Sequence, residues 1–244
     1  RKGAVQKVIR PDPSGYELVW IPGGTFMMGS DKYDDEQPIH EVQVSDFYMG
    51  RYAVTNEEYG RFLTATGYRE PDYWADRSFN QPRQPVVGVS WDDAKEYAAW
   101  AGLTLPSEAQ REYACRAGTK TRYYTGDSEE DLDRAGWYEE NSGGQLHPVG
   151  EKEPNDFGLY DMHGNVWEWI EDDYHEGYEE APDDGSAWID DPRGSHRVLR
   201  GGAWFYPADF CRSALRNWFE PDFRDYYIGF RLVCLPGPRG EPSR

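Results

Sequence analysis

The chain of 244 residues lacks most features that mark membrane, nucleic-acid-binding or disulfide-stapled proteins. It has no run of the roughly 18 apolar residues that a membrane helix needs, so we expect no membrane insertion. Its 26 lysines and arginines are outnumbered by 45 aspartates and glutamates, and a net charge of −19 excludes nucleic acid as a partner. Its three cysteines cannot all pair within one chain. A Cys115–Cys234 disulfide stays open, and three buried thiols are the simpler expectation.

What the sequence does contain begins with strand patterns and helix boundaries. Short alternating segments before residue 55 predict strands. Three helices are predicted over 55–67, 90–102 and 107–118, each with a Thr or Ser cap before it and a glycine at its end. Beyond Gly118 we find no periodic pattern. The sequence therefore predicts one α+β domain over residues 1–244 with little regular secondary structure.

The segment from 200 to 233 is unusually rich in aromatic residues, which make up ten of its 34 positions. Several rings come as adjacent pairs, such as Trp218-Phe219 and Tyr226-Tyr227, and neighbours in an extended chain point to opposite sides. Some rings must therefore face outward, and rigid rings suit a binding surface. The residues predicted to bind a ligand are Phe205, Tyr206, Asp209, Phe210, Leu215, Trp218, Phe219, Phe223, Asp225, Tyr226 and Tyr227.

Several motifs, in this order and spacing, resemble the formylglycine-generating-enzyme (sulfatase-modifying factor) family. They are IPGGTFMMGS, FYMGRYAVTNEEYGRFL, PVVGVSWDDAKEYAAWAG, LTLPSEAQREYACRAG, FGLYDMHGNVWEW, RGGAW and IGFRLV. The resemblance covers about residue 17 to 234. It implies an elaborated C-type-lectin fold.

The enzymes of that family oxidise a substrate cysteine with two cysteines of their own that bind Cu(I). The resemblance puts these cysteines at positions 206 and 211, where this chain has Tyr206 and Cys211. A phenol cannot replace a thiolate on Cu(I), so we expect no copper. A related branch of the family holds iron with three histidines, and the five histidines here are scattered.

The stretch LYDMHGNVWEW has features of a calcium site. Asp161 and Glu168 offer hard carboxylate oxygens, which suit Ca²⁺. The family resemblance implies a calcium ion on the side chains of Asp161 and Glu168 and on the carbonyls of Gly164 and Val166. The alternative is that the two acidic residues only cap turns.

The aromatic segment also resembles the variable region of retroelement-diversified proteins, which use the same lectin fold. A skeleton of RGGAW, CRSA, Arg216, Pro221, Arg224 and IGFRLV is interrupted by other positions. Most of those interruptions are reachable from an Asn codon by changes at adenines, but Trp218 is not. We expect the skeleton arginines to pair with acidic groups, which the chain has in excess.

The sequence thus predicts a non-enzymatic protein that displays a diversified, aromatic-rich surface in segment 200–233. Its partner would be a protein, and a carbohydrate is possible. One alternative is a formylglycine-generating oxidase or related modifying enzyme, and another is a purely structural lectin-like module. No signal peptide is visible, and surface display or secretion would suit a binding role, but the compartment is not specified.

Overall fold

Three of the four α-helices that the computed structural model describes begin at the capping residues predicted from the sequence. The structure describes residues 7–11 and 13–236. The side chains of Thr55, Ser90 and Ser107 each accept a hydrogen bond from a backbone N–H in the first turn of the helix. They start α1 (Asn56–Thr66), α2 (Trp91–Ala101) and α3 (Glu108–Arg116). The three predicted helices are therefore confirmed.

A fourth helix, α4 (Glu129–Ala135), was not predicted. It is capped in the same way by Ser128, which forms a capping box with Asp131. Two 3₁₀ turns, η1 (Asp34–Glu36) and η2 (Ala208–Cys211), complete the helical elements of the described residues. The irregular region after Gly118 thus contains one short helix.

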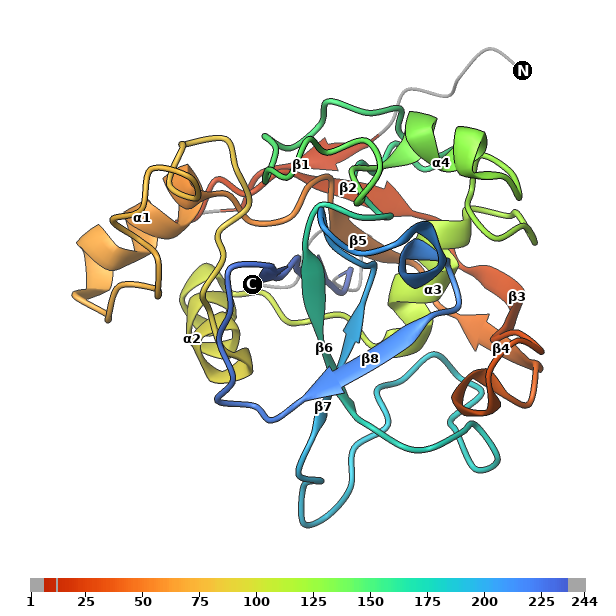
Figure 1. Cartoon of the computed structure of the whole chain (residues 1–244). Helices are drawn as coiled ribbons and strands as arrows, with labels where there is room; N and C mark the ends of the chain where they lie inside the picture. The colour runs from red at the N-terminus through yellow and green to blue at the C-terminus, as the bar shows by residue number, and fades with distance from the viewer. Residues whose placement is uncertain (1–6, 12, 237–244) are drawn as a thin grey trace.

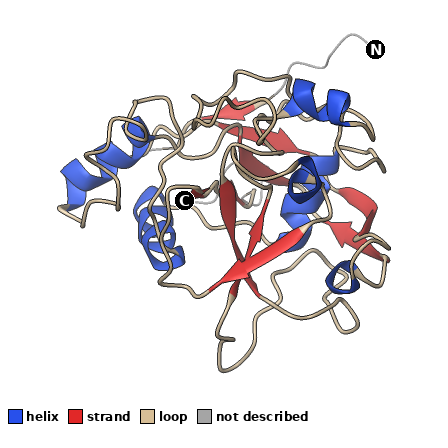
Figure 2. Ribbon diagram, viewed as in Figure 1, coloured by secondary structure: helices blue, strands red, loops and turns tan. Residues whose placement is uncertain are grey.

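The strands form three small sheets (Figure 2). The first has the order β1 (Val8–Ile9), β2 (Leu18–Ile21), β5 (Phe47–Gly50) and β10 (Val233–Cys234). The second is the pair of β3 (Gly24–Met28) and β4 (His40–Val44). The third has the order β8 (Arg216–Phe219), β7 (Arg197–Arg200), β6 (Trp167–Asp173) and β9 (Ile228–Gly229), with β9 parallel to β6. Short strands joined by long loops confirm the predicted α+β class.

The aromatic-rich segment is built into two of these sheets. It leaves β7, forms η2, β8 and β9, and ends in β10 beside β5. Between β8 and β9 it runs along the loop that joins α1 to α2, at the left of Figure 1. The backbone N–H of Gly88 donates to the carbonyl of Asp225 at 2.9 Å, and that of Trp91 donates to Pro221 at 3.0 Å. Residues more than 130 positions apart therefore share one surface.

The largest hydrophobic core lies between α1, α2 and the strands of the third sheet. Tyr59 and Tyr97 stack at 5.5 Å between ring centroids, and both contact Phe230. Trp167 and Trp169, which alternate along β6, are fully buried in the same cluster. A second cluster packs under α3. Among the described residues, no helix is long and apolar enough to cross a membrane.

Candidate functional site

Seven aromatic side chains meet at the surface in what we call the aromatic face: Tyr73, Phe79, Trp204, Phe205, Tyr206, Phe210 and Tyr226. Phe79 and Tyr226 stack at 5.5 Å between ring centroids, and Phe205 lies 4.8 Å from Tyr206. Phe210 and Tyr73 each keep 40% of their surface exposed, and the other five are half-buried. The rings support one another while part of each stays accessible, as a contact surface requires.

Two glycines turn the chain so that residues 204–206 reach the face. Gly201 and Gly202 have φ values of 109° and 76°, which favour glycine. A Cβ on Gly202 would also lie 2.5 Å from the Sγ of Cys211. After the turn, the N–H of Trp204 donates to Asn165 at 2.9 Å. The centre of the face is therefore held by backbone geometry.

Tyr206 lies at the centre of the face. Its ring packs edge-on against the buried Trp167 at 5.4 Å and lies 4.8 Å from Phe205. Its carbonyl accepts from the N–H of Glu139 at 3.0 Å. Burial raises the pKa of the Tyr206 phenol. At neutral pH the phenol therefore stays protonated.

The predicted ligand-binding residues divide among several places. Four of them, Phe205, Tyr206, Phe210 and Tyr226, belong to the aromatic face. Asp225 lies beside it, where its Oδ1 accepts from the N–H of Tyr226 at 2.8 Å. The structure thus brings together the beginning and the end of the predicted segment.

Trp218, Phe219 and Phe223 form a separate group, the β8 patch. Trp218 is 40% exposed and lies 4.3 Å from the ring of His196. Phe219 and Phe223 stack at 4.2 Å between ring centroids. We find no ring contact between this patch and the aromatic face among the described residues.

The structure corrects the prediction for Leu215 and Tyr227. Leu215 is only 5% exposed and lies in the largest hydrophobic core, so it cannot contact a ligand. Tyr227 is 8% exposed and packs beneath Phe205 and Tyr206 at 5.1 and 5.7 Å. Tyr227 therefore supports the face from below.

The carboxylate of Asp209 is already hydrogen-bonded to other side chains of the protein. Its carboxylate accepts from Lys32, from the Tyr33 hydroxyl at 2.8 Å, from Arg122 at 3.1 Å and from Arg212 at 3.0 Å. Partial burial alone would raise its pKa, but hydrogen bonds from Lys32 and Tyr33 and the nearby cations lower the pKa of Asp209 to about 2. Asp209 therefore joins three segments of the chain instead of offering a free carboxylate.

Sequence reasoning missed three members of the face. Tyr73 and Phe79 come from the loop between α1 and α2, and Trp204 was assigned to the fixed skeleton. The pairing of Gly88 with Asp225, which brings the two segments together, has no signal in the sequence. The only available sign was the cluster of aromatic residues in a loop without period.

The arginines of the segment are paired with carboxylates, as predicted. Arg200 and Arg216 both donate to Glu108 at the start of α3, at 3.0 and 2.7 Å. Burial alone would raise the pKa of Glu108, but the two arginines lower it. The other pairs are Arg200–Glu112, Arg212–Glu36, Arg224–Asp93 and Arg231–Glu168.

The residues predicted to hold calcium do not form a ligand cage. Asp161 fits the role in part, because its Oδ1 is buried without a partner among the described residues and burial raises its pKa to about 6. Glu168 does not, because Arg111 and Arg231 donate to its oxygens at 2.7 to 3.0 Å. The Gly164 carbonyl already accepts from the N–H of Val166 at 3.0 Å. Calcium binding stays a prediction, and it would require Glu168 to break its ion pairs with Arg111 and Arg231.

The copper site implied by the family resemblance does not fit this chain. Position 206 carries a phenol, and Cys211 is fully buried, which raises the pKa of its thiol to about 12. Copper binds the thiolate, so a protonated thiol alone is a poor ligand. Cys115, Cys211 and Cys234 are all buried thiols, which confirms the expectation of three thiols over a Cys115–Cys234 disulfide. No group of three or more His, Cys, Asp or Glu among the described residues could hold a metal ion.

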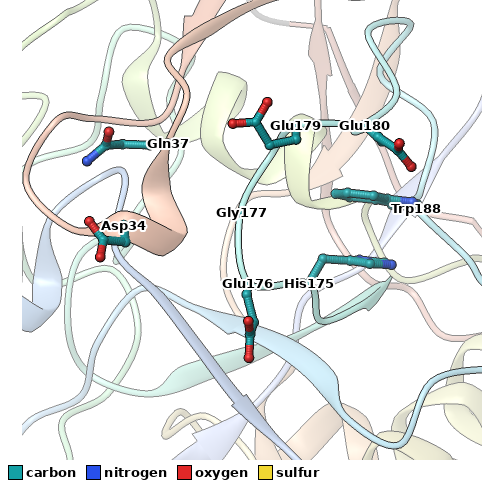
Figure 3. Close-up of a pocket in the computed structure, with 8 residues that line it drawn as sticks. All are labelled: Asp34, Gln37, His175, Glu176, Gly177, Glu179, Glu180 and Trp188. Carbon is teal, nitrogen blue, oxygen red and sulfur yellow. The ribbon is translucent and has the colours of Figure 1, made fainter.

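A hollow of about 540 Å³ lies elsewhere on the molecule (Figure 3). His175 and Trp188 stack along one side, at 3.6 Å between ring centroids. Asp34 and Gln37 lie on the opposite side, and three glutamates complete the wall. It shares no residue with the aromatic face, so this hollow and the aromatic surface are different places.

Comparison with known proteins assigns the family. The model of the sulfatase-modifying factor enzyme 1-like domain matches residues 5–235. The chain belongs to this family. The formylglycine-generating enzymes of Thermomonospora curvata and Mycobacterium tuberculosis are each 32% identical to it. The matches cover 90% of this chain in both cases, and 93% and 98% of the two enzymes.

Two solved structures extend the family assignment. PvdO from Pseudomonas aeruginosa is 36% identical, with a TM-score of 0.84 over 93% of this chain and 97% of that one. Treponema denticola variable protein 1 is 26% identical, with a TM-score of 0.80 over 96% of this chain and all of that one. Both likenesses confirm the predicted formylglycine-generating-enzyme type of C-type-lectin fold.

Other relatives of this family member are longer proteins. The serine/threonine-protein kinase pkn1 of Chlamydia caviae is 35% identical over 94% of this chain, which spans 39% of that relative. Hercynine oxygenase of Mycolicibacterium smegmatis is 29% identical, and the match covers 62% of its length. The chain thus spans well under half of the first of these curated relatives.

The prediction that the chain is not an enzyme is wrong. Relatives about 30% identical along nearly the whole chain are named as formylglycine-generating enzymes, and another as an oxygenase. The prediction gave too much weight to one missing cysteine, because it treated the loss of one known metal site as the loss of all catalysis.

Proposed function

We propose that this chain is a polypeptide-modifying enzyme of the sulfatase-modifying factor family, and that its substrate lies on the aromatic face. The observation that carries the proposal is the place of Tyr206. It occupies the position where the family resemblance puts the first copper cysteine, and it is the half-buried centre of a surface built from seven rings. In this proposal, position 206 still contacts the substrate, but it carries a phenol where the family resemblance puts a thiol.

The proposed reaction does not use two thiolates on copper. Tyr206 offers a protonated phenol, and Cys211 is a buried thiol with a raised pKa. The rings of the face supply large, rigid contact area, which favours a polypeptide over a small substrate. What this chain contributes is therefore the binding and orientation of a peptide beside Tyr206.

Selection from a random peptide library on the immobilised protein tests binding. We expect Tyr206→Ala to lower the affinity of the selected peptides at least about fivefold, since aromatic residues dominate binding energy at such surfaces. Glu179→Gln, in the hollow of Figure 3, should leave the affinity unchanged. If the Tyr206→Ala variant retains the same peptides as strongly, the peptide-binding role of the face is refuted.

Mass spectrometry of the selected peptides after incubation with the protein in air tests modification. We expect a change of peptide mass without added copper, and Cys211→Ser should keep that activity. Formation of formylglycine only after loading with Cu(I), and its loss in Cys211→Ser, would instead establish the copper oxidase. Unchanged peptide masses under both conditions would contradict an enzymatic role for the isolated chain.

A second candidate function is the display of a diversified binding surface. One observation favours it: the skeleton arginines Arg200, Arg212 and Arg216 are buried and paired, while four of the interrupting positions belong to the face. Such a division lets the rings change without loss of the fold. The structural likeness to the Treponema denticola variable protein agrees with it. A protein would be the preferred ligand, with a carbohydrate also compatible.

Sequences of this gene from sister isolates test the second candidate. Substitutions concentrated at positions 205, 206, 210 and 226, with the skeleton unchanged, are the expected result. Substitutions spread evenly along the gene would rule out diversification.

A further inference from the structure

The segments that build the aromatic face carry an excess of negative charge. Residues 68–88, 204–210 and 220–227, which carry the rings, and the adjoining residues 137–141 together contain nine aspartates and glutamates, four arginines and no lysine. One of the nine, Asp209, is paired with Lys32, Arg122 and Arg212, and the other eight still outnumber the arginines. The face therefore shares the sign of the whole chain, whose net charge is −19. An approaching cation is attracted both by the local groups and by the long-range field.

Two of these acidic residues are in contact with residues of the face, Asp225 through its side chain and Glu139 through its backbone. The Oδ1 of Asp225 accepts from the N–H of Tyr226, and the Tyr73 hydroxyl lies 3.5 Å from the same oxygen. Glu139 is fixed next to the centre of the face by its backbone bond to Tyr206, and its side chain is exposed. Negative groups thus lie at two separate edges of the ring surface.

Three of the four arginines in these segments are engaged within the protein. Arg224 donates to Asp93 at 2.8 and 3.1 Å, and Arg69 pairs with Asp72 at 3.0 Å. Arg83 lies over the ring of Tyr52, with 5.3 Å between the guanidinium carbon and the ring centroid. The fourth arginine, Arg77, is exposed. Among the residues that the structure describes, neither Asp225 nor Glu139 forms a salt bridge, so both carboxylates stay available to a cation of the partner.

We propose that the partner of the aromatic face is a basic polypeptide segment, with lysine or arginine next to an apolar residue. This inference rests on the proposed function and specifies its substrate class. The apolar residue packs on the exposed ring surface, and the cation lies over a ring face while pairing with Asp225 or Glu139. The arrangement rejects an acidic segment, because its carboxylates would meet carboxylates across a partly desolvated surface.

Three labelled peptides that share one Leu- and Phe-containing frame, and that carry Lys, Gln or Glu at the variable positions, test this inference. By fluorescence anisotropy at about 0.05 M salt, we expect the Lys peptide to bind at least about tenfold tighter than the Glu peptide. At about 0.5 M salt the difference should shrink several-fold. Asp225→Asn and Glu139→Gln should each weaken the Lys peptide by about threefold and leave the Gln peptide unchanged.

Glu179→Gln is the matched control, since it removes one negative charge far from the rings. It should change the affinity for the Lys peptide by less than the two substitutions at the face. Equal binding of the Lys, Gln and Glu peptides, or tighter binding of the Glu peptide, overturns the basic partner while leaving peptide binding intact. Failure of all three peptides, when peptides selected from the random library also fail, overturns the proposed function itself.

Discussion

Within segment 200–233, three arginines and three aromatic residues differ in the opposite sense from what their polarity would suggest: the arginines are buried and the rings lie at the surface. Arg200, Arg212 and Arg216 are at most 6% exposed, and each is paired with a carboxylate from another element. Phe205, Tyr206 and Tyr226 are half-buried and form a surface. For these six residues, the usual association of charge with the outside and rings with the inside is therefore reversed.

This reversal has a physical reason. A buried guanidinium is tolerated only when its donors are satisfied, and a paired one fixes the relative positions of the elements that carry its partners. The rings can stay near the surface because their edges pack on one another. The comparison teaches that buried ion pairs specify the geometry of this segment, while the rings supply its contact area.

The largest loss of stability should come from removing one of the buried arginines. Arg200→Met leaves Glu108 and Glu112 with fewer partners, and we expect it to lower the free energy of unfolding by about 3–5 kcal/mol. Urea unfolding followed by tryptophan fluorescence measures this loss. Arg69→Met, which breaks an exposed pair with Asp72, is the control and should cost less than about 1 kcal/mol. Similar losses in the two variants would contradict a special role for the buried pairs.

A smaller loss of stability should distinguish Leu215, which lies in the core, from Phe210, which lies on the aromatic face. Leu215→Ala should lower the free energy of unfolding by about 2–4 kcal/mol, because Leu215 is buried in the main core. Phe210→Ala should cost less than about 1 kcal/mol, because this ring is 40% exposed. The order should be reversed for peptide affinity, because Phe210→Ala removes a ring of the face and should weaken binding more than Leu215→Ala does. A large loss of stability in Phe210→Ala would show that the ring belongs to the core.

The smallest expected effect concerns Asp209 and depends on pH. Its pKa is about 2 in the folded protein, compared with about 4 for an unperturbed aspartate. The carboxylate therefore stabilises the fold above about pH 4, and this contribution is lost as the pH falls toward about 2. Asp209→Asn should remove about 1–2 kcal/mol at pH 7 and much less near pH 2.

Unfolding of both proteins in urea between pH 7 and pH 2 measures this difference. Asp222→Asn, which removes a carboxylate from an exposed position, is the control and should leave the pH dependence unchanged. A constant difference between wild type and Asp209→Asn at every pH would mean that the ion cluster is not what Asp209 contributes.

The helices were predictable because their signals are local. Thr55, Ser90 and Ser107 each act on a backbone N–H three residues further along the chain. Ser128 does the same for α4, but that helix has only seven residues and was overlooked in an acidic, irregular stretch. Pairing of the arginines with carboxylates could likewise be expected from the excess of acidic groups.

Only some of the residues that form the aromatic face could be predicted from the sequence. The segment of rings was visible in the sequence, but Leu215 and Tyr227 could not be separated from the exposed rings without a periodic pattern. Tyr73 and Phe79 join the face through contacts with Tyr226, about 150 residues further along the chain. Such long-range contacts depend on sheet topology and leave no local trace.

The double use of Glu108 has a consequence for protein engineering. One carboxylate at the start of α3 serves two arginines, on β7 and β8. The aromatic segment is therefore not a portable cassette: transplanted alone into another scaffold, it would bring its guanidinium groups without their counter-ions. A working graft would have to carry Glu36, Asp93, Glu108, Glu112 and Glu168 with it.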